Sequence, residues 1–163
     1  MTIENMALLN RYQEVMEAAG YVIFTTNVAG CFSHVENSIE ALTEYPANDL
    51  LGQPFTFIVD SEWHTRVDEY FSTVDKTGEK LTFEFPIITK SGTRRWVEQT
   101  VVKVTDGADV TFQSICQDIT NRKSEQTRYR ALFEQNNDAI FILDLAGKHI
   151  AANTQATKLL GYS

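Results

Sequence analysis

The amino-acid sequence predicts an α+β fold: one five-stranded antiparallel sheet with small helices on one face, preceded by an amphipathic helix and followed by a connector helix. Two observations carry this prediction. Strand-like runs open and close residues 20–119, and only short helical runs lie between them. In addition, residues 11–45 realign with residues 128–162 without a gap. Such a repeat indicates a tandem array, so we expect one whole module and the start of a second, within a longer polypeptide.

The first element, residues 1–19, is an expected amphipathic helix that ends at Gly20. Its apolar side chains recur at helical spacing, and they are more numerous than a lone surface helix exposes. These side chains are Leu8, Leu9, Tyr12, Val15 and Met16. The helix must dock either on its own sheet or on another subunit, and we expect the second arrangement, a homodimer.

The sheet domain opens with β-branched and aromatic runs at residues 21–26 and 31–35. A turn between these runs predicts a hairpin. Prolines and glycines then interrupt residues 36–59, so only short helices are expected there. A longer helix follows over residues 61–74, with Ser61 as a suitable N-cap.

Three further strands close the sheet domain. Residues 80–89 carry apolar side chains at every second position, which is the pattern of a strand with one buried face. Residues 94–105 and 110–119 are the other two strands, and short turns that contain glycine separate all three. Strands joined in this way form an antiparallel meander, so the hairpin and the meander together give five strands.

Residues 120–135 lack Gly and Pro and are rich in Arg, Lys, Glu and Gln, which predicts a charged connector helix. Residues 136–163 then begin the second copy. At the join, Asp118 or Thr120 can accept hydrogen bonds from the first N–H groups of the helix, and Ile119 can anchor the join in the core. We expect Asp118, Ile119 and Thr120 to relay a shift of the sheet to the helix; a capped linker with no switching role is the alternative.

Several short marks occur in order along the chain. They are Asn27 and Gly30 after the first strand, Tyr-Pro-Ala-Asn-Asp-Leu-Leu-Gly at residues 45–52, Lys-Ser-Gly at residues 90–92 before Arg95-Trp96, and Asp118-Ile119-Thr120. Together these marks resemble those of PAS domains, over residues 10–121 and again from residue 127. The second copy follows the family pattern more closely, because it has Asn153 and Gly161 where the first copy has Glu36 and Glu44.

The resemblance implies a sensory and signal-transduction module that detects a signal or self-associates, and relays the result to a downstream output domain of the same chain. Such modules often precede a histidine kinase of a two-component system or a cyclic-dinucleotide enzyme, and we expect the histidine kinase. A receptor for a small molecule or a cofactor is the alternative. No chemistry within the module is implied, and the sequence has no Ser/His/Asp set, phosphate loop or metal-ligand spacing.

Composition narrows the partners and the compartment. The net charge is −8 and no basic block occurs, which argues against nucleic acid and an anionic membrane as partners. No apolar run approaches the length of a membrane span, and no signal peptide opens the chain. The two cysteines are too few for a secreted disulfide scaffold. We therefore expect a cytoplasmic module, whether its parent protein is soluble or membrane-anchored.

PAS domains hold cofactors between the sheet and the small helices, and the resemblance allows the common kinds to be considered in turn. Flavin photoadduct chemistry uses a cysteine at the position where this sequence has Phe55. Haem-binding members use a histidine on or just after the longer helix, and His64 lies in the first turn of that helix, which leaves haem ligation as an alternative. We expect no cofactor and no metal.

The interior is then either filled or shaped into a ligand pocket. Aromatic side chains are the candidates in both cases, because they pack one another in cores and also line apolar pockets. They are Phe24, Phe55, Phe57, Phe71, Phe83 and Phe85. A ligand would also need inward polar groups, which Thr25, Asn37 or Gln99 could supply.

Overall fold

The computed structural model describes residues 11–12, 14–74 and 78–161. The chain divides into two compact units, and the boundary falls after Thr120. Near the N-terminus, residues 11–12 and 14–18 are helical, as the sequence pattern predicts. Leu8 and Leu9, two of the expected dimerisation residues, lie outside the described residues.

The first unit is built on one antiparallel sheet of five strands. These are β1 (Tyr21–Asn27), β2 (Phe32–Val35), β3 (Lys80–Ile88), β4 (Arg94–Asp106) and β5 (Asp109–Asp118). Their order across the sheet is β2-β1-β5-β4-β3, so the first hairpin and the final meander meet where β1 pairs with β5. The five-stranded α+β fold predicted from the sequence is therefore confirmed.

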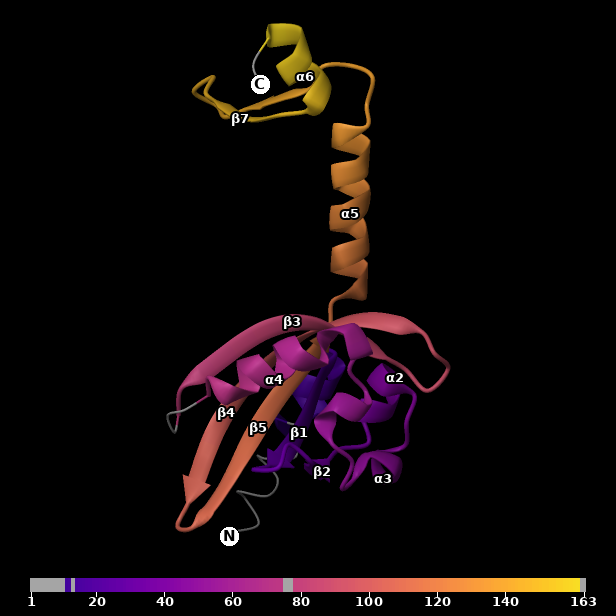
Figure 1. Ribbon diagram of the computed structural model, residues 1–163, viewed down its shortest axis with the longest axis vertical. Coiled ribbons are helices and arrows are strands. Elements are labelled where there is room, and N and C mark those ends of the chain that lie inside the picture. The colour runs from indigo at the N-terminus through magenta and orange to yellow at the C-terminus, as the bar shows by residue number, and fades with distance from the viewer. Residues whose placement is uncertain (1–10, 13, 75–77, 162–163) are drawn as a thin grey trace. The chain divides into compact units, whose positions relative to one another are not determined.

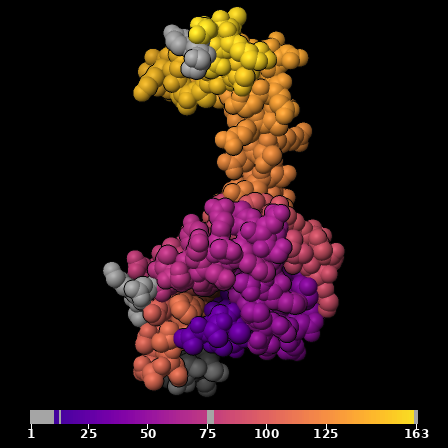
Figure 2. All heavy atoms as spheres, viewed as in Figure 1, coloured from indigo at the N-terminus to yellow at the C-terminus, as the bar shows by residue number. Residues whose placement is uncertain are grey.

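Short helices fill the interval between β2 and β3. They are α2 (Ile39–Thr43), α3 (Ala47–Leu50), the 3-10 turns η1 (Phe55–Phe57) and η2 (Ser61–Trp63), and α4 (His64–Ser72). Figure 1 shows α4 lying against one face of the sheet, with α2 and α3 beside it. Figure 2 shows the magenta atoms of this helical layer in front of part of the sheet, while orange atoms of β4 and β5 remain visible beside it.

The start of the longer helix differs from the prediction. The segment begins as a 3-10 turn, and its N-cap is Asp60, whose carboxylate accepts a hydrogen bond from the Glu62 N–H at 3.1 Å. Asp60 is held in place because its own N–H donates to the carbonyl of Pro86 on the edge strand β3, at 3.0 Å. Ser61, the cap expected from the sequence, is the first residue inside the turn.

The core lies between the sheet and the helices. Strand residues alternate between buried and half-buried along β1, and the same alternation appears in the centre of β4. The register places Phe24 of β1 opposite Ser114 of β5, and Ser114 opposite Val101 of β4, so all three point to the helical face. All three side chains are at most 1% exposed, as expected for a sheet face that a helical layer covers.

The second unit repeats the beginning of the first. It contains most of α5 (Thr120–Glu134), the hairpin β6 (Phe141–Leu143) with β7 (His149–Ala152), and α6 (Thr154–Leu160). The hairpin turns of both units have the same construction: Asn27 Oδ1 accepts from the N–H groups of Ala29 and Cys31, and Asp144 Oδ1 accepts from two N–H groups at the same spacing. Among the described helices, none has the length and apolar character needed to cross a bilayer.

Candidate functional site

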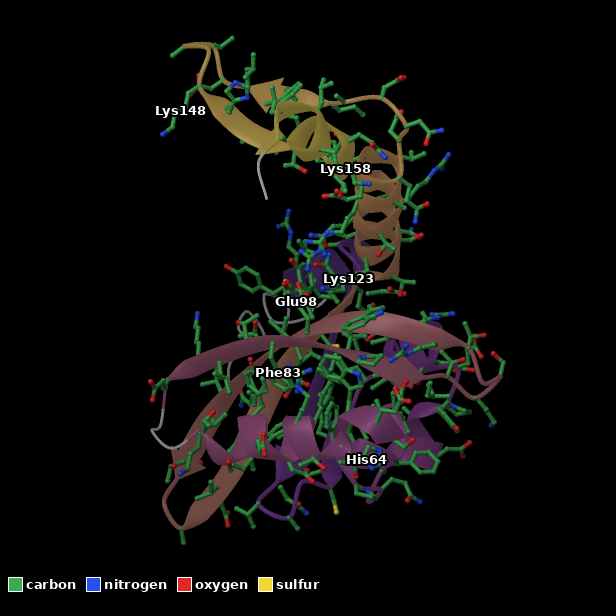
Figure 3. The ribbon with its side chains drawn as sticks, turned by 45° about the horizontal axis from the view of Figure 1, so that its top comes forward. His64, Phe83, Glu98, Lys123, Lys148 and Lys158 are labelled. Carbon is green, nitrogen blue, oxygen red and sulfur yellow. The ribbon has the colours of Figure 1, made fainter. Side chains whose placement is uncertain are left out.

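An aromatic cluster fills the space between the sheet and α4. Phe55 is its centre: its ring lies 5.6 Å from that of Phe24, 5.4 Å from that of Phe71 and 5.7 Å from that of Phe85, between ring centroids. Phe83 joins through Phe85, with centroids 5.0 Å apart. In Figure 3 the Phe83 side chain lies among the side chains gathered between β3 and α4. Five of the six aromatic side chains singled out in the sequence thus come together, in the geometry of packed aromatic pairs.

Phe57 does not belong to this cluster, and its assignment to the interior was wrong. Its side chain is 49% exposed and meets the ring of Tyr45 edge-on, with centroids 5.3 Å apart. The reason is the 3-10 turn at residues 55–57. Because a 3-10 helix rotates by about a third of a turn per residue, Phe55 and Phe57 cannot both face the core.

Beside the aromatic cluster lies a cleft of about 440 Å³, between α4 and the ends of β1, β4 and β5. One wall is apolar and includes Phe55, Phe71 and Phe112. The register brings Thr26, Phe112 and Lys103 into one row across three strands, and all three line the cleft. Thr26 is fully buried, and its hydroxyl has no hydrogen-bond partner among the described residues. A buried hydroxyl without a partner is uncommon and calls for an explanation.

The other polar candidates are placed differently. Gln99 is fully buried on the helical face of β4, where its Nε2 donates to Ser114 Oγ at 2.8 Å. Thr25 alternates with the buried Phe24 and Thr26 and so faces away from the helical layer, and Asn37 is exposed. Burial raises the pKa of the neighbouring Cys116 thiol to about 12, so that this thiol is neutral. Of the three polar candidates, therefore, only Gln99 reaches the interior.

His64 begins α4 and is half-buried (Figure 3). Its Nε2 lies 3.1 Å from the carbonyl oxygen of Val59, within hydrogen-bonding distance. This ring nitrogen would have to lose its contact with Val59 before it could bind a haem iron as an axial ligand.

The end of β5 is joined to β4 by a continuous set of hydrogen bonds. The Ile119 N–H donates to the Trp96 carbonyl at 2.8 Å, and the Trp96 N–H donates to Thr120 Oγ1 at 2.9 Å. The Asp118 carboxylate accepts from the Thr120 N–H at 2.8 Å, and Ile119 is buried at 4% exposure. Thr120 is also the first residue of α5. The first residue of the helix is thus bonded to the sheet itself. The Thr120 hydroxyl accepts its hydrogen bond from the Trp96 N–H of β4, and not from an N–H group of the helix.

Trp96 also contacts the helical layer. Its ring meets that of Trp63 edge-on, with centroids 5.3 Å apart, immediately before α4 begins. Next to it, Arg94 forms an ion pair with Asp60, the cap of the preceding turn, at 2.8 Å. Trp96, which is bonded to the junction between β5 and α5, therefore also contacts the start of α4.

Arg95 links the same region to α2. Its Nη1 donates to the carbonyls of Ala41 and Leu42 at 2.7 and 3.0 Å, its Nη2 donates to Glu44 at 3.2 Å, and Nη1 lies 4.0 Å from Asp118 Oδ2. Hydrogen bonds from the side chain and backbone of Ser91 hold the pKa of Glu44 below its ordinary value, and the Arg95 guanidinium lowers it further. The sequence marked Arg95 only as part of a family pattern, because its hydrogen-bond partners Ala41, Leu42 and Glu44 lie more than fifty residues away.

In the second unit, the side chain of Asn153 bonds several elements, as that of Arg95 does in the first unit. It is fully buried, its Oδ1 accepts from the N–H groups of Ile140 and Ala156, and its Nδ2 donates to the carbonyls of Phe133 and Asp138, all within 3.0 Å. One side chain thereby joins the last turn of α5, the hairpin and α6.

Comparison with known families assigns the fold. The family described as the PAS fold matches residues 10–119, and the one described as the PAS domain matches residues 127–163. The chain belongs to the PAS family. No curated protein matches it.

Solved structures agree on the fold. A PAS domain of a protein from Colwellia psychrerythraea is similar with a TM-score of 0.62 and 20% identity, over 71% of this chain and 99% of that chain. A sensory box histidine kinase/response regulator from Burkholderia thailandensis is similar with a TM-score of 0.62 and 18% identity, over 77% and 96% of the two chains. A PAS domain of an HTR-like protein from Haloarcula marismortui has a TM-score of 0.53 and 19% identity, over 72% and 100%.

Proposed function

We propose that this chain is a sensory and signal-transduction module that passes a rearrangement of its sheet to α5, and through α5 to a downstream histidine kinase domain of the same polypeptide. The observation that carries the proposal is the double attachment of Trp96. Its backbone N–H and carbonyl hold Thr120 and Ile119, and its ring touches Trp63 at the start of α4. A shift of α4 or of β4 therefore acts directly on the first residue of α5.

Two further observations support this proposal. One of the solved structures that share the fold is named as a sensory box histidine kinase/response regulator, and another as a PAS domain from a two-component sensor histidine kinase. Tyr12 and Val15 are 63% and 61% exposed, so this part of the N-terminal helix offers apolar surface to a second copy of the chain. We propose a cytoplasmic homodimer that carries out no catalytic step within this chain and has no nucleic-acid or membrane partner.

Amide hydrogen exchange of the whole chain tests the relay. Thr120→Val removes the hydroxyl that Trp96 bonds, so the amides of the first turn of α5 and of Trp96 should exchange faster, while those near the Phe24–Ser114 pair stay protected. Thr120→Ser keeps the hydroxyl and should exchange as the wild type does. If Thr120→Val changes exchange equally across the whole sheet, the junction is an ordinary part of the core and the relay is wrong.

A second function, a small-molecule receptor, is favoured by one specific observation. Thr26 is among the residues that line the cleft of about 440 Å³, and its buried hydroxyl has no partner among the described residues. A ligand with an apolar body and one hydrogen-bonding group would pack on Phe55, Phe71 and Phe112 and satisfy Thr26. Native mass spectrometry of the purified chain would detect such a molecule.

Variants of Thr26 separate specific binding from mere trapping. Thr26→Val keeps the shape of the side chain but removes the hydroxyl, and Thr26→Ser keeps the hydroxyl. The receptor function predicts that bound mass is lost in Thr26→Val and retained in Thr26→Ser. A purified chain that carries no added mass, and a Thr26→Val variant more stable than the wild type, would show an empty cleft with a merely unpartnered hydroxyl.

A further inference from the structure

Arg95 lies between the end of α2 and Asp118, at the junction between β5 and α5. Its guanidinium donates to two carbonyls at the end of α2, Ala41 and Leu42, and to the carboxylate of Glu44. The last carbonyls of a helix have no partner within the helix, and they carry its negative dipole end. A planar group with five donors can satisfy several of these acceptors at once, which an ammonium cannot do with the same geometry.

Glu44 occupies a backbone position that suits glycine. It caps α2 with a φ of 62°, in the left-handed region, and the matching residue of the second unit is Gly161 with a φ of 73°. A side chain at such a position is uncommon because of its steric cost. Here the carboxylate accepts from the Ser91 N–H at 3.0 Å and from Arg95 at 3.2 Å. Glu44 therefore ties the end of α2 to the β3–β4 turn and to Arg95.

Asp118 is the second carboxylate beside Arg95. Its Oδ1 accepts from the Thr120 N–H at 2.8 Å, while its Oδ2 lies 4.0 Å from Arg95 Nη1. The guanidinium thus stands between two carboxylates, in hydrogen-bond contact with Glu44 and outside that contact with Asp118. Its side chain is 26% exposed, so both attractions act in partly desolvated surroundings.

We propose that Arg95 is a coupling residue that α2 and Asp118 share. While the α2 carbonyls and Glu44 hold the guanidinium, Asp118 is left to cap Thr120 and α5 stays joined to the sheet. When α2 or the β3–β4 turn moves away from Arg95, the guanidinium forms an ion pair with Asp118. The Asp118 carboxylate then no longer accepts a hydrogen bond from the Thr120 N–H. This inference rests on the proposed relay and adds its input: α2 and the turn at residues 90–93.

The test uses amide exchange at Thr120 in the whole chain. Glu44→Gln weakens the hold on Arg95, and we expect Thr120 to exchange about fivefold faster, the change that the loss of a helix cap produces. Glu44→Gly should do the same while it relieves the left-handed backbone, so the fold is retained even where the glutamine variant is unstable. The double variant Glu44→Gln with Asp118→Asn should exchange no faster than Asp118→Asn alone, because Arg95 then has no second carboxylate to close on.

The matched control is Thr82→Val. It breaks the hydrogen bond between the hydroxyls of Thr82 and Thr100, 2.8 Å apart, which joins β3 to β4 away from α2, from the β3–β4 turn and from Asp118. Thr120 exchange should be unchanged in this control. If both Glu44 variants match Thr82→Val, the coupling role of Arg95 is overturned. The relay itself is judged separately, because Thr120→Val breaks the junction whether or not Arg95 controls it.

Discussion

Replacing Thr120 with valine tests how much the junction contributes to the first unit. The hydroxyl accepts from the Trp96 N–H at 2.9 Å and also lies 3.5 Å from the Trp96 carbonyl. Valine has nearly the same shape, so packing is kept while a half-buried N–H loses its partner. Leaving such a donor unsatisfied costs about 1–3 kcal/mol, and because Thr120 is partly exposed we expect a loss of about 1.5 kcal/mol.

Urea denaturation followed by circular dichroism measures this loss. The chain offers a control with the same substitution: Thr127 in α5 is exposed and donates to the Lys123 carbonyl at 2.8 Å. Thr127→Val should change the free energy of unfolding by less than about 0.5 kcal/mol. The exciton signal of the two tryptophans, Trp63 and Trp96, reports whether their contact survives. Equal losses in the two variants, or no loss in Thr120→Val, would refute the reasoning.

Three further predictions concern other parts of the chain. Asn153→Ala should expose the amides of Ile140 and Ala156 to exchange and destabilise the second unit by about 2–3 kcal/mol, while Asn136→Ala, which loses one exposed hydrogen bond, should cost less than half as much. The pKa of Glu44 is lowered in the folded state, so ionised Glu44 stabilises the fold above its ordinary pKa, and this stabilisation is lost as the pH falls through the folded-state pKa. The stability difference between wild type and Glu44→Gln should therefore shrink below about pH 4.5 and stay constant at neutral pH. Val15→Glu should shift the chain towards monomer in analytical ultracentrifugation, and an unchanged dimer, or a monomeric wild type, would exclude the exposed helix face as the interface.

The fold could be predicted from the sequence because its determinants are local. Alternating apolar residues in β3 and β4 fix which face is buried, and glycine-containing turns fix where each strand ends. The internal repeat predicted the second unit, because the same hydrogen-bonded turn forms at Asn27 and at Asp144. Even the error at Ser61 was one residue in size, because the cap was chosen by residue type and not by the contact of Asp60 with the edge of β3.

The site was predicted only in part, because its contacts join residues far apart in the chain. The aromatic cluster could be anticipated from residue type, yet the turn geometry that puts Phe57 outside could not. Asp118, Ile119 and Thr120 were located correctly along the chain, but their partner, Trp96, lies on another strand. The sequence marked Arg95 as part of the family pattern and Glu44 as a departure from it, but only the structure shows that the two side chains meet.

The central claim is that the junction at Thr120 transmits a change from the sheet to the output domain. In the proposed histidine kinase, the most direct test is the autophosphorylation rate with Thr120→Val, compared with the rate with Thr127→Val. The proposed relay predicts that Thr120→Val alters this rate, and its response to the input signal, while Thr127→Val behaves as the wild type. Identical rates and responses in the two variants would contradict it.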